Sequence, residues 1–249
     1  MKIKFICLLV LISFLLSGCI KQSAPTAKTE ATAETTTQKS TATTRLIPST
    51  TERATVKKWE KEIVSPVAEK NYLNFENSSR EREYDPEIVM VHFISAVVLS
   101  ENDPYNEGLI RGIFEQDDIG INYIIDREGN VECYLPENRA AWHAGSGTYM
   151  NNEKYTNEMN KYSIGIEMMA IGSKADMAQY MTGAEYDALN DEFYGFTDAQ
   201  YKSLKTLLAD ICGRYSIPMD RKHIIGHEEY SENKTDPGEL FEWNRLGLE

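Results

Sequence analysis

The run "EIVMVHFIS", residues 87–95, decides the fold of this 249-residue chain. It is rich in β-branched and aromatic side chains and shows no alternation of polar and apolar positions, which predicts a strand buried on both faces. His92 lies inside this run, where an imidazole is costly unless its nitrogens have partners. Two interpretations remain open from the strand alone: a core histidine bonded to the backbone, or a ligand placed at a site.

The rest of the chain predicts the elements that surround this strand. The run "YSIGIEMMAIG" (162–172) predicts a second buried strand, and "KHIIGH" (222–227) predicts a short last one. Two further strands around a turn are expected over 120–135, and a short helix over 106–117. Thr197 and Gln200 form a capping-box pattern at the start of a long helix. We expect a short helix and a loop over 59–75, and a loop with a helical turn over 176–195. The order predicts a mixed α/β fold: one domain with a central mixed β-sheet flanked by helices.

The N-terminus predicts export and anchoring. A short basic start, an apolar run and "LLSGC" (15–19) describe a secretory signal over 1–18 that is too short to span a membrane. The ending resembles a bacterial lipobox, which implies lipidation of Cys19; the alternative is an ordinary signal peptide with an incidental cysteine. Residues 19–56 are rich in Thr, Ala and Ser, so this segment predicts the lipidated cysteine followed by a disordered tether. The folded domain is expected over 57–249.

Charge and cysteine content narrow the choice of partners. The chain has 26 basic and 39 acidic residues, a formal net charge of −13, and no basic stripe. Nucleic-acid binding is therefore not expected, and anionic lipid would not attract the protein, so membrane attachment would depend on Cys19. Cys133 ends a strand-like run and Cys212 lies on a helix face. They could pair in an oxidising compartment, but this placement favours two buried free thiols.

The segment "GHEEYSENKTDPG" (226–238) holds the second group of candidate residues. His227 and Asp236 are separated by eight residues, and the turn-forming residues between them let the segment fold back. Taken alone, His227 would be a surface loop residue. Together with His92, two histidines and one aspartate suit tetrahedral zinc with a fourth position left for water, the arrangement of a catalytic zinc.

Two more charged residues complete this candidate centre. Zinc lowers the pKa of a bound water, but the reaction still needs a carboxylate to move the proton and a cation to stabilise the oxyanion. Glu167 lies inside the apolar run "SIGIEMM", where a carboxylate is costly unless it serves such a site. Lys234 is carried by the same loop as Asp236. Outside the centre, His223 is expected to be structural, and the tyrosines of 180–201 could form a substrate wall or simply be exposed in a loop.

Four motifs in order, "IVMVHFISA", "AWHAGSG", "SIGIEMM" and "GHEEYSENKTDPG", resemble the zinc-dependent N-acetylmuramoyl-L-alanine amidases, whose fold is shared with peptidoglycan recognition proteins. The resemblance covers roughly residue 77 to the C-terminus, and each motif alone is weak. Carried over by position, the resemblance implies that the zinc ligands are His92, His227 and Asp236. It implies Glu167 as the general acid/base and Lys234 as the oxyanion partner. The residues that it implies for the substrate groove are Trp142, His143 and Ala144. The same histidine, His143, could also be a simple loop residue.

One departure from the family pattern is informative. Some relatives have a tyrosine at the position where this chain has Ile121, and those relatives lack a glutamate at position 167. The chain therefore resembles the branch that uses a glutamate, with aspartate as third ligand. Tyr123 is not expected to have the catalytic role of that tyrosine.

The resemblance implies hydrolysis of the amide bond between the lactyl group of N-acetylmuramic acid and L-alanine by a zinc-activated water. Two alternatives stay open: a non-catalytic module of the same fold that binds peptidoglycan or muropeptides, and a zinc peptidase that cuts within the stem peptide. The expected partners are peptidoglycan and, through the lipid on Cys19, a bacterial cell membrane or outer membrane. We expect an extracytoplasmic monomer.

Overall fold

The computed structural model describes residues 61–248. The predicted signal, Cys19 and the tether lie outside these residues, so the boundaries at 18 and 56 stay predictions. Within the described part of the chain, no helix combines the length and the apolar character needed to cross a membrane.

A six-stranded mixed sheet forms the centre of the domain, with strand order β1-β5-β4-β7-β3-β8. All neighbouring strands run parallel except the pair β4 and β5. The strands of this sheet are β1 (Glu69–Lys70), β3 (Ile88–Ile94), β4 (Tyr123–Ile125), β5 (Val131–Cys133), β7 (Ser163–Met169) and β8 (Ile224–Gly226). A separate antiparallel pair consists of β2 (Ser79–Glu81) and β6 (Arg139–Ala141). The predicted single mixed α/β domain is confirmed.

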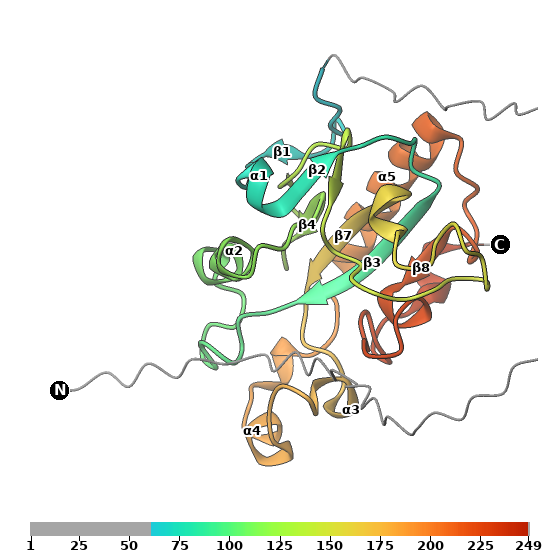
Figure 1. The fold of residues 1–249 in the computed structure, drawn as a ribbon. Coiled ribbons are helices and arrows are strands. Elements are labelled where there is room, and N and C mark those ends of the chain that lie inside the picture. Colours follow the sequence, from blue (N-terminus) through green and yellow to red (C-terminus); the bar gives the residue numbers. More distant parts are fainter. Residues whose placement is uncertain (1–60, 249) are drawn as a thin grey trace, which may run out of the picture. The chain divides into compact units, whose positions relative to one another are not determined.

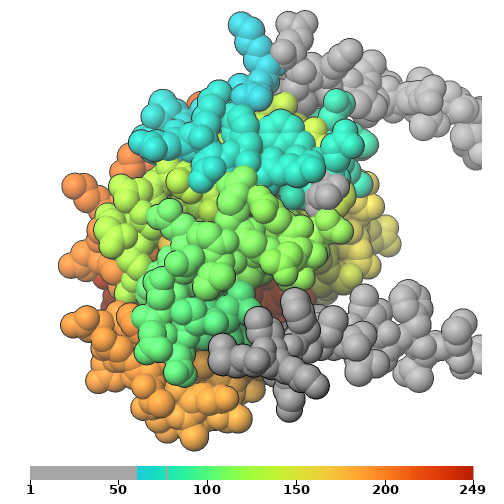
Figure 2. All heavy atoms as spheres, turned by 90° about the vertical axis from the view of Figure 1, so that its left-hand side faces the viewer, coloured from blue at the N-terminus to red at the C-terminus, as the bar shows by residue number. Residues whose placement is uncertain are grey.

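Helices cover both faces of the central sheet, which explains why β3 and β7 have continuous apolar sequences. The long helix α5 (Asp198–Tyr215) lies on one face, and α1 (Phe75–Ser78) and α2 (Glu107–Gln116) lie on the other side (Figure 1). Figure 2 shows the second side: the segment before β3 is uppermost in cyan, α2 is central in green, and the region of α3 and α4 is lowest in orange.

Alternation along the two central strands determines which side chains face α5. Val89 and Val91 of β3 and Ile166 of β7 pack in the same hydrophobic cluster as the buried residues of α5. Because successive side chains of a strand point to opposite faces, His92 and Glu167 project from the other face. The two are direct neighbours across β3 and β7, since His92 pairs with Glu167 in the parallel register. Strand geometry alone therefore brings these two residues together.

The predicted helix starts agree with the observed caps. Thr197 and Gln200 form the capping box of α5, and Asn106 caps α2 through a bond from the Leu109 N–H. The stretch 176–195, predicted as a loop with a helical turn, holds the end of one short helix and two complete ones, each with a side-chain N-cap: α3 (Lys174–Met177), α4 (Gly183–Asp187) and the 3-10 helix η2 (Asp191–Phe193). The other 3-10 helices are η1 (Met159–Lys161), η3 (His227–Glu229) and η4 (Trp243–Leu246).

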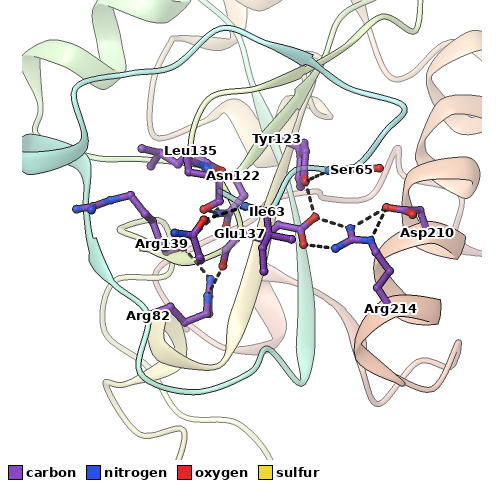
Figure 3. Close-up of polar contacts among 12 residues, drawn as sticks. Ile63, Ser65, Arg82, Asn122, Tyr123, Leu135, Glu137, Arg139, Asp210 and Arg214 are labelled. Atoms are coloured by element: carbon purple, nitrogen blue, oxygen red, sulfur yellow. Dashed lines mark hydrogen bonds and ion pairs between the residues drawn. The ribbon is translucent and has the colours of Figure 1, made fainter. Parts of the chain in front are cut away.

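A buried polar network fastens the first described segment to the domain (Figure 3). Glu137 is fully buried and binds Arg214 of α5 through both carboxylate oxygens, at 2.5 and 2.6 Å. Tyr123 donates its hydroxyl hydrogen to Glu137 and accepts a bond from the Ser65 N–H at 2.8 Å. The network thus joins the N-terminal segment, the end of the β5–β6 connection and α5 on the face of the sheet opposite His92.

Candidate metal and catalytic site

Three ligand atoms converge beside the ends of β3 and β8. His92 is supplied by β3, His227 follows β8 directly, and Asp236 lies on the loop after η3. The Nδ1 atoms of the two histidines are 3.1 Å apart, and Asp236 Oδ2 lies 2.8 Å from His92 Nδ1 and 3.1 Å from His227 Nδ1. The structure therefore brings together all three residues predicted as metal ligands, and they form a candidate metal site.

Proton accounting at His227 shows that this cluster suits a cation. His227 Nε2 lies 2.9 Å from the Ala144 carbonyl oxygen, which can only accept a hydrogen bond. In the neutral ring the hydrogen is therefore on Nε2, and Nδ1 presents a lone pair to the carboxylate oxygen of Asp236. Two acceptors face each other without a hydrogen between them, and a cation resolves this repulsion. Ligand atoms at zinc-bond lengths in a tetrahedron lie about 3.3 Å apart, close to the separations observed here.

The protonation of the cluster fits metal binding. Burial lowers the pKa of His92 to about 4, so the ring is neutral at physiological pH, the form in which imidazole binds metals. Burial would raise the pKa of Asp236, but the two imidazole rings beside it lower that pKa well below its ordinary value. Two imidazole nitrogens and one carboxylate oxygen form a donor set typical of zinc.

Glu167 lies next to this cluster, opposite His92 in the sheet. Its Oε2 atom is buried and has no hydrogen-bond partner among the described residues. Burial and the negative charge of Asp236 raise the pKa of Glu167 well above its ordinary value, while the positive charge of Lys234 opposes this shift. A carboxyl group held in this state has a high affinity for a proton, which is what a group that accepts and returns protons requires.

The loop that carries Lys234 and Asp236 is fixed at several points. The Glu228 N–H donates to the Asp236 carbonyl at 3.0 Å. The buried carboxylate of Asp176 in α3 accepts a bond from the Glu239 N–H at 3.1 Å, and the Thr235 hydroxyl donates to the Asp176 carbonyl at 3.2 Å. Lys234 is exposed, and its charge acts on both His92 and Glu167.

The three residues expected in a substrate groove occupy different positions. Trp142 is half-buried, with its backbone bonded to Ser78 and Gly120. Ala144 is fully buried, and its carbonyl binds His227. His143 is half-buried and has both ring nitrogens bonded inside the protein: Nδ1 lies 3.0 Å from His92 Nε2, and Nε2 lies 3.0 Å from the Ser163 hydroxyl. Their contact with substrate stays a prediction.

Residues given structural roles also have defined partners. His223 lies just before β8 and its Nδ1 is 2.7 Å from Asp220 Oδ1, away from the metal cluster. Tyr123 is buried on the α5 face, which agrees with the expectation that it has no catalytic role. In the tyrosine-rich stretch, Tyr186 stacks on Tyr194, whereas Tyr180 is exposed.

Sequence reasoning missed the residues that support this site. Asp176 and Ser163 gave no motif, because their contribution depends on contacts between segments far apart in the chain. For Asp176, the capping-box pattern formed with Ser173 would have indicated a helix start but not the bond to the Asp236 loop. For Ser163, only its position at the start of a buried strand was visible.

Comparison with known proteins agrees with this architecture. The family model described as N-acetylmuramoyl-L-alanine amidase matches residues 82–239. The 1,6-anhydro-N-acetylmuramyl-L-alanine amidase AmpD of Enterobacter cloacae is 30% identical over 179 residues, which are 67% of this chain and 82% of AmpD. The N-acetylmuramoyl-L-alanine amidase AmiD of Escherichia coli is 33% identical over 113 residues, 45% of this chain and 35% of AmiD.

A solved structure shows the same fold. A crystal structure of a selenomethionine derivative of AmpD aligns with a TM-score of 0.52 and 23% identity, over 75% of this chain and 96% of that chain. A mixed α/β domain with a candidate His–His–Asp metal site defines the class as a hydrolase of the amidase fold. The chain belongs to the N-acetylmuramoyl-L-alanine amidase family, and it is an amidase that acts on peptidoglycan.

Proposed function

We propose that this protein is a zinc-dependent amidase that cleaves the bond between the lactyl group of N-acetylmuramic acid and L-alanine. His92, His227 and Asp236 would hold the zinc ion. The observation that carries the proposal is the position of Glu167: its buried Oε2 atom has no hydrogen-bond partner among the described residues, and the residue lies directly across the sheet from His92. A fold that only bound muropeptide would gain nothing from this costly group.

The residues divide the chemical work as follows. A bound zinc ion supplies a Lewis acid and lowers the pKa of water. Glu167 accepts the proton of the attacking water and then returns it to the nitrogen of the leaving L-alanine. Lys234 places a positive charge where the amide oxygen becomes negative; this charge acts more strongly on the transition state than on the neutral amide. Glutamate as the proton carrier and aspartate as the third ligand would be the arrangement of the glutamate-using branch of the family.

The first test is the identity of the products. The protein is incubated with purified peptidoglycan and with soluble muropeptides, with and without a chelator, and the released material is identified by mass. We expect free stem peptides that begin with alanine, no release with the chelator, and recovery when zinc is added back.

Other products would favour the alternatives. Fragments cut within the stem peptide would identify a zinc peptidase. Binding of muropeptide without any cleavage, by protein that holds one zinc per chain, would contradict the proposal and identify a binding module. Release that is unchanged by the chelator would remove zinc from the mechanism while leaving the amidase in place.

We also propose that the protein is extracytoplasmic and anchored to a bacterial membrane through lipid on Cys19. The support is the "LLSGC" sequence at 15–19 after a signal-like segment. Growth with a labelled fatty acid should label the wild type, whereas Cys19→Ser should abolish the label and release the protein from the membrane fraction. Label that persists in Cys19→Ser would contradict this anchor.

A further inference from the structure

His92 is reached by a chain of hydrogen bonds that starts at a backbone carbonyl. The Ser163 hydroxyl lies 2.8 Å from the Met159 carbonyl oxygen and 3.0 Å from His143 Nε2. His143 Nδ1 in turn lies 3.0 Å from His92 Nε2. His92 Nδ1, at the far end of this chain, is the atom that faces His227 and Asp236.

The direction of every bond in the chain follows from its first acceptor. The Met159 carbonyl can only accept, so the single hydroxyl hydrogen of Ser163 points toward it. Ser163 must then accept at its oxygen, and His143 carries its hydrogen on Nε2. His143 Nδ1 is therefore an acceptor, and it takes the hydrogen on His92 Nε2. His92 is left with a lone pair on Nδ1, directed at the metal site.

We propose that His143 and Ser163 are positioning residues of the metal centre, which hold His92 in the tautomer and orientation that bind the ion. This inference deepens the proposed function, since it rests on His92 being a ligand. It assigns His143 the role of accepting a hydrogen bond from a metal ligand, whereas the sequence predicted contact with substrate. A ligand's second nitrogen is commonly bonded in this way, and loss of such a partner costs about 10–100-fold in metal affinity.

The surrounding structure makes room for the His143 ring and fixes its backbone. A Cβ added at Gly165 would lie 2.7 Å from His143 Cγ, so the ring occupies space that only glycine leaves open on β7. The N–H groups of His143 and Ala144 both donate to Asn160 Oδ1, at 3.1 and 2.9 Å. The same two residues thus serve both histidine ligands, because Ala144 binds His227 through its carbonyl while His143 binds His92.

The tautomers can be read directly in the wild-type protein. The chain has four histidines, so long-range nitrogen–proton NMR spectra of the imidazole rings give four patterns. We expect the hydrogen on Nε2 for His92, His143 and His227, both without metal and with zinc. His223 is the internal contrast, because its Nδ1 faces the Asp220 carboxylate and should carry the hydrogen. A hydrogen on Nδ1 of His143 in either state would overturn the proposal.

Zinc affinity, measured by competition with a chromophoric chelator, tests the same point in variants. His143→Ala should weaken zinc binding by about 10–100-fold. His143→Asn should bind within a few-fold of wild type, because its amide oxygen can accept from His92 Nε2 where His143 Nδ1 did. Ser163→Ala should weaken binding by a smaller factor, since the His143 ring remains but its tautomer is no longer fixed.

The order of zinc affinities among the variants separates a positioning role of His143 from a general loss of structure. Thermal unfolding of the metal-free proteins shows whether His143→Ala and His143→Asn lose similar stability; only the first should lose zinc. Equal zinc loss in both variants, or wild-type affinity in His143→Ala, would overturn the proposal. Failure of the amidase proposal would instead appear as intact zinc binding without product, so the two outcomes are distinguishable.

Discussion

At the scale of single residues, the buried Oε2 atom of Glu167 has no hydrogen-bond partner among the described residues, and this gives the first prediction. Glu167→Gln keeps the size of the side chain but cannot carry a proton. We expect kcat to fall by about 10²–10⁴-fold while zinc content and muropeptide binding are retained. The measurement is the rate of peptide release, together with metal analysis of the same preparation.

Glu228 offers a matched control for Glu167. It is also a carboxyl group with a buried oxygen that has no hydrogen-bond partner among the described residues, and burial raises its pKa to about 8. It follows His227 in sequence but has no part in the proposed reaction. Glu228→Gln should therefore leave kcat within a few-fold of wild type. A comparable loss in both variants would mean that Glu167 acts through the charge balance of the site and not through proton transfer.

Lys234 gives the second prediction at this scale. If its charge stabilises the negative oxygen of the transition state, Lys234→Ala should lower kcat by about 10²–10³-fold with little change in zinc affinity. Lys234→Arg should restore part of the rate, because the charge is kept on a differently shaped group. Lys205→Ala, an exposed lysine of α5 on the opposite face of the sheet, is the control. A change in KM alone would assign Lys234 to substrate binding.

Two of the predicted site residues were visible in sequence because their chemical types are rare in their surroundings. His92 and Glu167 stand inside strands of apolar residues, and each would be costly without a site. His143 and Ser163 could not be assigned in the same way, because the sequence shows no sign of the bond between residues 20 positions apart. A histidine two residues before a glycine in a loop suggests exposure, whereas here the His143 ring lies against His92.

At the scale of elements, the ion pair between buried Glu137 and partly exposed Arg214 joins the β5–β6 connection to α5. We predict that Glu137→Gln lowers the free energy of unfolding by about 2 kcal/mol, because it leaves the Arg214 guanidinium and the Tyr123 hydroxyl with a weaker partner. Denaturant unfolding measures the change. Lys174→Ala breaks an exposed pair with Asp187 and should cost less than about 1 kcal/mol. Equal effects would show that the network in Figure 3 adds no special stability.

Elements with strong local signals were predicted with nearly correct bounds, and elements that depend on a partner were not. The buried strand expected over 87–95 is β3, and the strand over 162–172 is β7. By contrast, β1, β2 and β6 are two or three residues long and largely polar or small, so only their pairing defines them. In 59–75, where a short helix and a loop were expected, the described part has mostly irregular backbone with β1 and the start of α1.

At the scale of the domain, one hydrophobic cluster links the central sheet to α5 and contains both cysteines of the described residues. Cys133 at the end of β5 and Cys212 on α5 are buried, and they are free thiols, as their placement in sequence favoured. The pairing that an oxidising compartment would permit is absent from the described residues. Because both lie in the same cluster, the accessibility of the two thiols to a reagent reports whether this core is folded.

Thiol labelling therefore tests the cooperativity of this core. Burial raises the pKa of Cys212 to about 11 and that of Cys133 further, so at pH 8 neither forms the reactive thiolate while folded. Both thiols have folded pKa values above the ordinary thiol value of about 8.5, so burial of the neutral thiols contributes fully to folding stability below about pH 8.5. The contribution of Cys212 is lost as the pH rises through about 11.

We predict that a thiol reagent at pH 8 labels the peptides containing Cys133 and Cys212 only at the rate of global unfolding. Both peptides, followed by mass, should then show the same dependence on denaturant concentration, since neither side chain is exposed unless the sheet separates from α5. The reference rates come from labelling folded protein without denaturant and fully unfolded protein in denaturant, with each reaction quenched at intervals. Faster labelling of Cys212 alone would show that α5 detaches before the sheet opens, so that the domain unfolds in two steps.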